Sequence, residues 1–313
     1  MAINASLKYF KTDDGLNLYY QHWIPDSPKA LLVFVHDLGG HSNRHQLFLR
    51  YFVERKYAVA LYDQRGHGKS EGRRGDADQF GDFVRDLSTF IHFSRAQVPA
   101  GTPIFPIGLG FGSQLIINLL VPAWHAVSWG GSHPGKVDGL VAISASIVSL
   151  ISIPAWKLKL FDRVEKFFPK LRVNTYVDPS DVVGHQDAVT AFKNDLLINR
   201  KISLRLKREW LENTQLIMAM ASRIQIPALM LHGNEDRIAS PEGTKQFFLR
   251  LPSAAKRLHV YEGSLHDLTN DVEQERVFGD IERWLEEMRH SVGMRENHHV
   301  AKENVCELLP FPF

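Results

Sequence analysis

The sequence has almost no cysteine and no marked excess of charge of either sign. Cys306 is the only cysteine in 313 residues, which excludes an intramolecular disulfide and a zinc site built on cysteines. Lys and Arg (37) nearly balance Asp and Glu (35), which argues against nucleic acid as a partner. Nothing in the sequence calls for a metal or another cofactor, and we expect none. Any electrostatic partner must therefore be recognised by a local patch.

Long hydrophobic runs are also missing. No apolar stretch reaches the roughly 18 residues of a membrane span, and Met1 to Leu18 lacks the apolar core of a signal peptide. We therefore expect a cytoplasmic protein. The hydrophobic fraction of 44% is ordinary for a globular chain, and this length suits one large core that carries an insertion.

The most informative stretch lies between residues 103 and 117. An apolar run, closely spaced glycines and a second apolar run predict a buried strand, a tight turn and a helix. This is the shape of a nucleophile elbow, whose signature is G-x-S-x-G. Here the frame reads Gly108-Leu109-Gly110-Phe111-Gly112, and Gly110 at its centre has no side chain that could attack a substrate. The sequence thus keeps the scaffold for nucleophilic catalysis and lacks the nucleophile.

Two other interpretations of this stretch are weaker. A dinucleotide-binding loop, G-x-G-x-x-G, needs glycine where Ser113 stands, and no acidic residue ends a second strand about 20 residues later. Ser113 is the nearest serine, but it lies a turn into the predicted helix, where its hydroxyl points away from the site.

The order of elements predicts an α/β fold with a doubly wound, mostly parallel sheet. Apolar strands at 31–36, 58–63 and 103–107 alternate with helices at 43–55 and 80–91. Further strands follow at 137–144, 228–232 and 258–261, and an edge strand is expected at 16–23.

The domain organisation follows from where this rhythm stops. We expect a core in two parts, 1–148 and 224–289, a helical cap at 149–223, and a polar, irregular tail at 290–313 with an apolar end. One cap helix carries an apolar stripe from Leu160 to Leu171 flanked by lysines and arginines. It either packs on its own domain or lies on an anionic membrane surface.

An acid and a histidine occur where an elbow requires them. Asp236 follows the strand at 228–232 and His266 follows the strand at 258–261, in the order nucleophile, acid, histidine. Asp236 alone could cap the helix after Ser240, and His266 alone is one of 15 histidines. Together, and in frame with Gly110, they predict the remnant of a catalytic triad in which histidine moves protons and aspartate orients its ring.

An oxyanion hole is expected beside them, built from the backbone N–H groups of Phe111 and Leu38. Asp37 fits poorly there, because a carboxylate opposes a developing negative charge unless it is turned away or protonated. Alternatively, Asp37 occupies a left-handed turn where glycine is usual.

These motifs resemble the monoacylglycerol lipase and lysophospholipase branch of the α/β-hydrolases. The resemblance rests on residues 33–42, on the loop from Asp63 to Ser70, on the acid loop 231–236 and on His266, and in the cap on 178–180, 195–197 and 202–206. It implies a serine hydrolase that cleaves fatty esters, with an acyl tunnel in the cap, no cofactor and contact with membrane surfaces.

The chain departs from this branch at two positions, and these departures frame two hypotheses. His36-Asp37-Leu38-Gly39 replaces H-G-x-G, and Gly110 replaces the serine. Both changes resemble the N-myc downstream-regulated proteins, which are non-catalytic. The first hypothesis is a fatty-ester hydrolase that is impaired because Gly110 replaces its nucleophile. The second is a non-catalytic module that binds a lipid or a protein partner. The sequence leaves the oligomeric state open.

Overall fold

Apolar runs form the central strands of the molecule. The computed structural model describes residues 8–121, 135–151, 154–175 and 177–306. Five strands are buried along their whole length, as expected for strands covered on both faces: β3 (Leu31–Val35), β4 (Ala58–Tyr62), β5 (Ile104–Leu109), β6 (Leu140–Ile143) and β9 (Ala228–Gly233).

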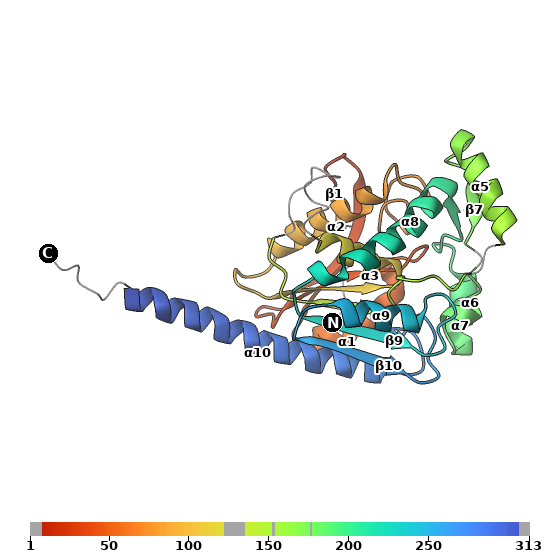
Figure 1. Ribbon diagram of the computed structural model, residues 1–313. Coiled ribbons are helices and arrows are strands. Elements are labelled where there is room, and N and C mark those ends of the chain that lie inside the picture. The colour runs from red at the N-terminus through yellow and green to blue at the C-terminus, as the bar shows by residue number, and fades with distance from the viewer. Residues whose placement is uncertain (1–7, 122–134, 152–153, 176, 307–313) are drawn as a thin grey trace.

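These strands belong to an eight-stranded sheet in the order β1-β2-β4-β3-β5-β6-β9-β10. At one edge, β1 (Lys8–Lys11) and β2 (Asn17–Trp23) pair antiparallel, and β2 joins β4 in the same way. All pairs from β4 to β10 (Lys256–Tyr261) are parallel. The predicted doubly wound, mostly parallel α/β sheet is therefore confirmed (Figure 1).

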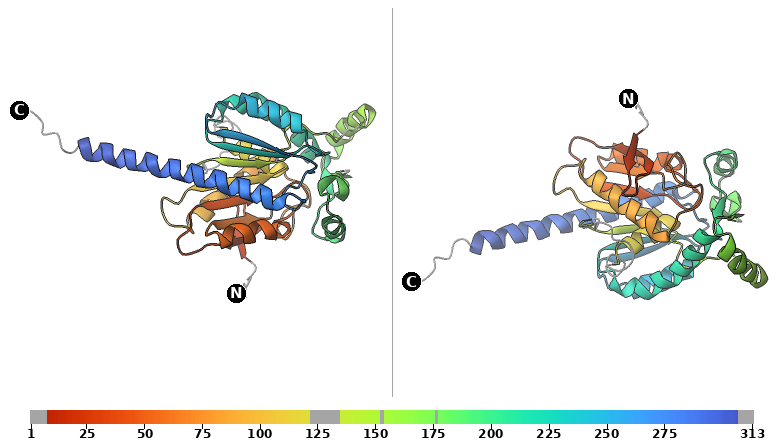
Figure 2. Two further views of the ribbon diagram at one scale, coloured as in Figure 1. Left: turned by 90° about the horizontal axis from the view of Figure 1, so that it is seen from below. Right: turned by 90° about the horizontal axis from the view of Figure 1, so that it is seen from above.

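Helices cover both faces of the sheet (Figure 2). One face carries α2 (Phe80–Arg95), α3 (Phe111–Leu119) and α9 (Pro241–Arg250), and the other carries a short 3-10 turn (Ser42–His45), α1 (Gln46–Glu54) and α10 (Gln274–Cys306). Along β3, Leu31, Val33 and Val35 enter the first core while Leu32 and Phe34 enter the second. This alternation follows from the two-residue period of a strand.

The cap contains more than the helices expected from the sequence. It comprises α5 (Ala155–Phe167), α6 (Pro179–Val182), α7 (Gln186–Asn194) and α8 (Leu204–Met220), which ends in a 3-10 turn (Ala221–Arg223). In addition, β7 (Arg172–Asn174) and β8 (Lys201–Ser203) form an antiparallel pair. Strands of three residues are too short to produce a recognisable alternation, so the sequence did not indicate them.

The cap is held on two loops of the core. The Asn199 N–H donates to the Gly39 carbonyl at 2.8 Å, and the Ser203 N–H donates to the Gly75 carbonyl at 2.9 Å. Asp76 is buried, and it accepts hydrogen bonds from Ser203 Oγ at 2.6 Å and from Arg205 at 3.0 Å. The cap is thereby placed over the carboxyl ends of the parallel strands.

The apolar stripe of the cap packs on its own domain only in part. Phe161 and Val164 are half-buried, and Lys207 of α8 lies over the Phe161 ring. The other stripe residues, Leu160, Phe167, Phe168 and Leu171, are exposed, with Phe167 at 79%, and their apolar surface faces outward together with that of Trp156.

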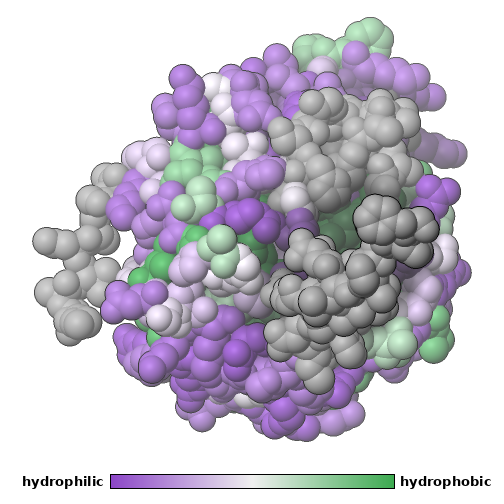
Figure 3. All heavy atoms as spheres, turned by 90° about the vertical axis from the view of Figure 1, so that its left-hand side faces the viewer, coloured by the Kyte–Doolittle hydropathy of each residue, from purple (hydrophilic) through white to green (hydrophobic). Residues whose placement is uncertain are grey.

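The expected irregular tail is also wrong as far as the structure describes it. Helix α10 continues through Cys306 and extends past the body of the molecule (Figure 1). Residues 290–306 contain no proline, the residue that most strongly ends a helix, so the helix can continue through this polar segment. The apolar end at 308–313 lies outside the described residues. The face at this end of α10 is mostly hydrophilic (Figure 3). Among the described residues, no helix is both long and apolar enough to cross a membrane.

Candidate active site

The turn between β5 and α3 has the geometry of an elbow. Gly110 has φ +53° and ψ −112°, a backbone conformation that is strained for any residue with a side chain. The flanking glycines allow the backbones to approach: a Cβ at Gly108 would lie 2.5 Å from Ser113 Cα, and one at Gly112 would lie 2.7 Å from the carbonyl carbon of Val35. The predicted strand, tight turn and helix are therefore present.

The predicted acid and histidine meet at this turn. Asp236 Oδ2 lies 2.7 Å from His266 Nδ1, and both side chains are buried. Asp236 Oδ1 accepts from the backbone N–H groups of Ile238 and Ala239 at 2.8 and 2.9 Å, which fixes the carboxylate. On the other side of the ring, a Cβ built on Gly110 would lie 2.9 Å from His266 Nε2. Residues from three separate loops thus converge as the sequence predicted.

A second imidazole, which the sequence reading missed, also contacts Asp236. His232 Nε2 lies 2.9 Å from Asp236 Oδ2, and its Nδ1 lies 2.9 Å from Thr244 Oγ1. The signal was available, because His232 ends the apolar run of β9 four residues before Asp236. His232 therefore helps to hold Asp236 in place.

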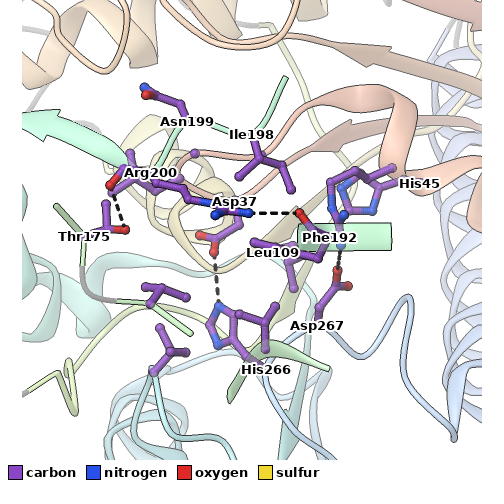
Figure 4. Close-up of a pocket in the computed structure, with 17 residues that line it drawn as sticks. Asp37, His45, Leu109, Thr175, Phe192, Ile198, Asn199, Arg200, His266 and Asp267 are labelled. Atoms are coloured by element: carbon purple, nitrogen blue, oxygen red, sulfur yellow. Dashed lines mark hydrogen bonds and ion pairs between the residues drawn. The ribbon is translucent and has the colours of Figure 1, made fainter. Parts of the chain in front are cut away.

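Asp37 occupies the space in which the missing nucleophile would stand. The Phe111 N–H donates to Asp37 Oδ1 at 2.6 Å, and Asp37 Oδ2 lies 3.3 Å from His266 Nε2. This second contact is an ion pair without hydrogen-bond geometry. A Cβ on Gly110 would collide with Asp37 Oδ1 and lie 2.5 Å from Asp37 Cγ. Figure 4 shows the carboxylate pointing toward the His266 ring.

This position decides between the alternatives left open for Asp37. The carboxylate is not turned away from the site. Asp37 is also not among the described non-glycine residues with positive φ, so the left-handed turn is the wrong explanation for it. Its negative charge is instead met by the Phe111 N–H and by His266.

The fold directs Asp37 to this place through its backbone. Strands β3 and β5 are neighbours in the sheet, so the loop after β3 lies beside Gly110. The Asp37 carbonyl accepts from Gly40 N–H at 2.9 Å and from His36 Nδ1 at 2.8 Å. His36 Nε2 accepts from the Gln64 N–H at 3.0 Å, so the ring proton is on Nδ1. Burial lowers the pKa of His36 to about 3, which keeps this support neutral.

The electrostatics of the site are those of one imidazolium between two carboxylates. Burial alone would lower the pKa of His266, but Asp236 and Asp37 together raise it well above its usual value. Burial would raise the pKa of Asp236, but attraction to His266 and the contacts with His232 and His266 hold it well below its usual value. Both carboxylates therefore favour the protonated form of His266.

Three predicted residues remain, Ser113, Phe111 and Leu38. Ser113 Oγ is directed at the carbonyls of Gly108 (2.6 Å) and Ile143 (3.1 Å), behind the elbow, which excludes it as a nucleophile. The Phe111 N–H points into the site as expected, although Asp37 takes it. Leu38 lines the cavity beside Asp37, and its role as a second oxyanion donor stays a prediction.

Two small pockets meet at Asp37 under the cap. The more polar of the two, here called the polar pocket, has a volume of about 60 Å³; much of its lining is apolar, but it also includes Arg44, Thr175, Asn199, Arg200, His266 and Asp267 (Figure 4). The apolar pocket has a volume of about 50 Å³ and is lined mainly by Phe111, Ile151, Val177, Ile202, Trp210, Leu211 and Ile238. Asp37 and Leu38 line both. A compound with an alkyl part and a polar part could therefore place its junction at Asp37.

The described part of the chain contains no group of three or more His, Cys, Asp or Glu side chains arranged to hold a metal ion.

Comparison with known proteins identifies the family of this chain. Residues 26–273 match the hydrolase family described as serine aminopeptidase, S33. The human monoglyceride lipase is 26% identical over 292 residues, which is 92% of this chain and 92% of the lipase. The crystal structure of a monoacylglycerol lipase from Paleococcus ferrophilus has a TM-score of 0.74 and 26% identity, and the match covers 87% of this chain and 99% of that one. The resemblance inferred from the motifs is confirmed.

Another relative is much longer than this chain. An abhydrolase domain-containing protein of Dictyostelium discoideum is 27% identical over 287 residues, which is 91% of this chain but only 29% of that protein.

Proposed function

Because the chain belongs to the α/β-hydrolases of the serine aminopeptidase S33 family, we propose that its site derives from a fatty-ester hydrolase of the monoacylglycerol lipase type. In the unchanged protein, this site binds fatty-acyl compounds but does not cleave them through an acyl-serine intermediate. The observation that carries the proposal is the placement of His266 and Asp236 against Gly110, with Asp37 where the nucleophile's side chain would stand.

Two chemical losses support the impaired state. Without a side chain at Gly110 no acyl-enzyme can form, and loss of a catalytic serine costs on the order of a millionfold in kcat. In addition, the Phe111 N–H that would stabilise a substrate oxyanion already donates to Asp37. A replacement at Gly110 alone therefore cannot restore the reaction.

The two pockets support an amphiphilic ligand. The apolar pocket suits an alkyl chain, and the polar pocket, with Arg44 and Arg200, suits an oxygen-rich head group. Their volumes of about 50 and 60 Å³ are small, so a long acyl chain requires the cap to move outward.

The decisive test combines two substitutions. We expect Asp37→Gly with Gly110→Ser to hydrolyse medium-chain monoacylglycerols or nitrophenyl esters at least about a thousandfold faster than the unchanged chain. The Gly110→Ser variant alone should stay at the starting level, because its side chain collides with Asp37. Asp37→Gly alone should also stay there, because it still lacks a nucleophile.

The matched control is Asp37→Gly with Gly110→Ala, which opens the same space without a hydroxyl. If the folded serine-containing double variant is no faster than this control, the site does not derive from an ester hydrolase.

The alternative is a non-catalytic protein. It is supported by the same observation, that the Asp37 carboxylate fills the space left free by Gly110. In this case the capped pockets hold a lipid permanently. Native mass spectrometry should then detect a copurified acyl compound, and the double variant should remain inert. A protein that carries no acyl compound would contradict this alternative.

Contact with a membrane surface is part of the proposal. The exposed apolar residues of α5 are Trp156, Leu160 and Phe167, and the lysines and arginines of the same helix would attract anionic lipid. Such contact would bring the cap to the lipid phase in which fatty esters reside.

A further inference from the structure

We propose that Asp37 is itself a nucleophile, which displaces an anion from an alkyl carbon and is regenerated by water. The proposal goes beyond the ester chemistry inferred above, because it assigns an activity to the unchanged chain and a different substrate class, the alkyl halides.

The first support is position. A first side-chain atom on Gly110 would collide with Asp37 Oδ1, so the carboxylate fills the space beside the elbow and reaches it from the loop after strand β3 instead of from β5. Its side chain is 27% exposed and lines both pockets, so a small ligand can reach it. Nucleophile, histidine and acid are then Asp37, His266 and Asp236, in contact in that order.

The second support is that Asp37 already accepts the hydrogen bond of the Phe111 N–H. This contact indicates which class of electrophile the site can use. A carbonyl substrate would need this donor for its own oxyanion, and Asp37 Oδ1 already accepts from it at 2.6 Å. Displacement at an alkyl carbon develops no oxyanion on the substrate. Instead, negative charge develops on Asp37 itself when water attacks the alkyl ester, and Oδ1 is then already at the donor.

The bonds balance over two steps. In the first, an oxygen of Asp37 forms a bond to the alkyl carbon while the carbon–halogen bond breaks, and halide leaves with the electron pair. In the second, water attacks Asp37 Cγ, the Cγ–O bond to the alkyl group breaks, and an alcohol leaves with one of the water protons. The other water proton is left on the Asp37 carboxyl, which loses it to return to the carboxylate. The sum is alkyl halide plus water giving alcohol, halide and one proton.

His266 serves the second step. Its Nε2 lies 3.3 Å from Asp37 Oδ2, so it can take a proton from water approaching Cγ and return it to the departing alcohol oxygen. Alkylation of Asp37 removes the smaller of the two carboxylate effects that raise the pKa of His266, so this pKa falls and the neutral ring that a base requires becomes more accessible.

The polar pocket suits the leaving group. Arg44 and Arg200 line it together with Asp37 and Asp267. Asp267 lies 3.8 Å from Arg44, so Arg200 is the cation whose charge lowers the cost of releasing an anion there. The apolar pocket of about 50 Å³ suits a short alkyl chain.

The experiment uses the full chain, bromoethane and 1-bromohexane in water enriched in oxygen-18. We expect bromide release with bromoethane as the faster probe, and we expect oxygen-18 in the Asp37 carboxylate, located by peptide mass spectrometry after many turnovers. Asp37→Asn, which keeps the shape and can still accept from Phe111, should lower bromide release by at least about a thousandfold. His266→Gln should release one bromide per chain and then stop, with the alkyl group retained on Asp37.

Two results would overturn the proposal: no bromide release above buffer with either probe, or release with oxygen-18 in the alcohol and none in Asp37. The labelling result does not depend on any variant, so a misfolded Asp37→Asn protein leaves the test intact. The ester-hydrolase test replaces Asp37, whereas this test requires it, so the two proposals can fail separately.

Discussion

Asp37 and Gly110 can only be understood as a pair. Glycine at 110 leaves the space that the Asp37 carboxylate fills, and this carboxylate excludes any side chain at 110. Contacting residues of this kind are expected to show strongly non-additive effects when they are substituted. A single reversion at either position therefore says little about the ancestry of the site.

Buried neutral histidines predict a loss of stability in mild acid. Burial lowers the pKa of His36 and His67 to about 3 and that of His45 to about 4. In the unfolded chain each histidine takes up a proton near pH 6.5, whereas in the folded protein it stays neutral at that pH. Because protonation then favours the unfolded chain, the free energy of unfolding falls as the pH drops from 6.5 toward the folded-state pKa values. From pH 7 to pH 5 we expect each to cost on the order of 2 kcal/mol, measured by denaturant unfolding.

His45→Gln should make this acid loss smaller by about one such contribution, because glutamine can still contact Thr269 and does not titrate. Asp267, Arg44 and His41 face His45 and are unchanged in this variant. An equal acid loss in both proteins would contradict the assignment. His266 acts in the opposite direction: its raised pKa gives stability below pH 6.5 that is lost as the pH rises through the raised value.

At the scale of elements, the cap depends on Asp76. This buried carboxylate accepts from Ser203 Oγ at 2.6 Å and from Arg205 at 3.0 Å, where β8 meets α8. Asp76→Ala leaves Arg205 without its buried partner, and we expect it to cost about 3–5 kcal/mol of unfolding free energy. Asp78 also contacts Arg205, at 3.1 Å, but its side chain is 81% exposed. The matched variant Asp78→Ala should change stability by less than about 1 kcal/mol.

Helix α5 should bind anionic vesicles through its exposed apolar residues. Phe167 at the end of α5 and Phe168 directly after it are 79% and 66% exposed, and burying a phenylalanine contributes about 1.5–3 kcal/mol. Replacing both by serine should weaken cosedimentation with phosphatidylglycerol vesicles at least about tenfold. Leu249→Ser on α9 removes a residue that is 75% exposed outside the cap, and it should have no effect. Equal binding of all three proteins would exclude membrane contact through α5.

At the scale of the whole molecule, α10 connects the C-terminal part of the chain to the first part of the core. Glu286 accepts from Lys29 Nζ at 2.7 Å and from the Tyr57 hydroxyl at 2.8 Å, and Trp284 packs against Phe105 with ring centroids 5.8 Å apart. Trp284 is fully buried, so Trp284→Ala should cost about 3–5 kcal/mol in denaturant unfolding. Arg283→Ala, one residue away with a side chain that is 64% exposed, should stay within about 0.5 kcal/mol. Similar losses in both variants would show that α10 does not stabilise through its buried face.

The order and type of the main elements could be read from the amino-acid pattern, because apolar strands and amphipathic helices have periods that are local in the chain. The same holds for Gly110, Asp236 and His266, since each follows a recognisable strand. The prediction of an irregular tail is wrong because a polar composition does not exclude a helix. The partial exposure of the α5 stripe could not be predicted, because an apolar stripe does not say how much of it a neighbouring element covers.

The role of Asp37 could not be read from any local pattern. It depends on the adjacency of β3 and β5, which are far apart in sequence, and on a carboxylate reaching across from one strand's loop to the turn after the other. Local composition therefore decided which residues carry chemistry, through their functional groups and the strands that precede them. Three-dimensional packing alone decided that the place of the absent nucleophile is filled, because the occupant comes from a different part of the chain.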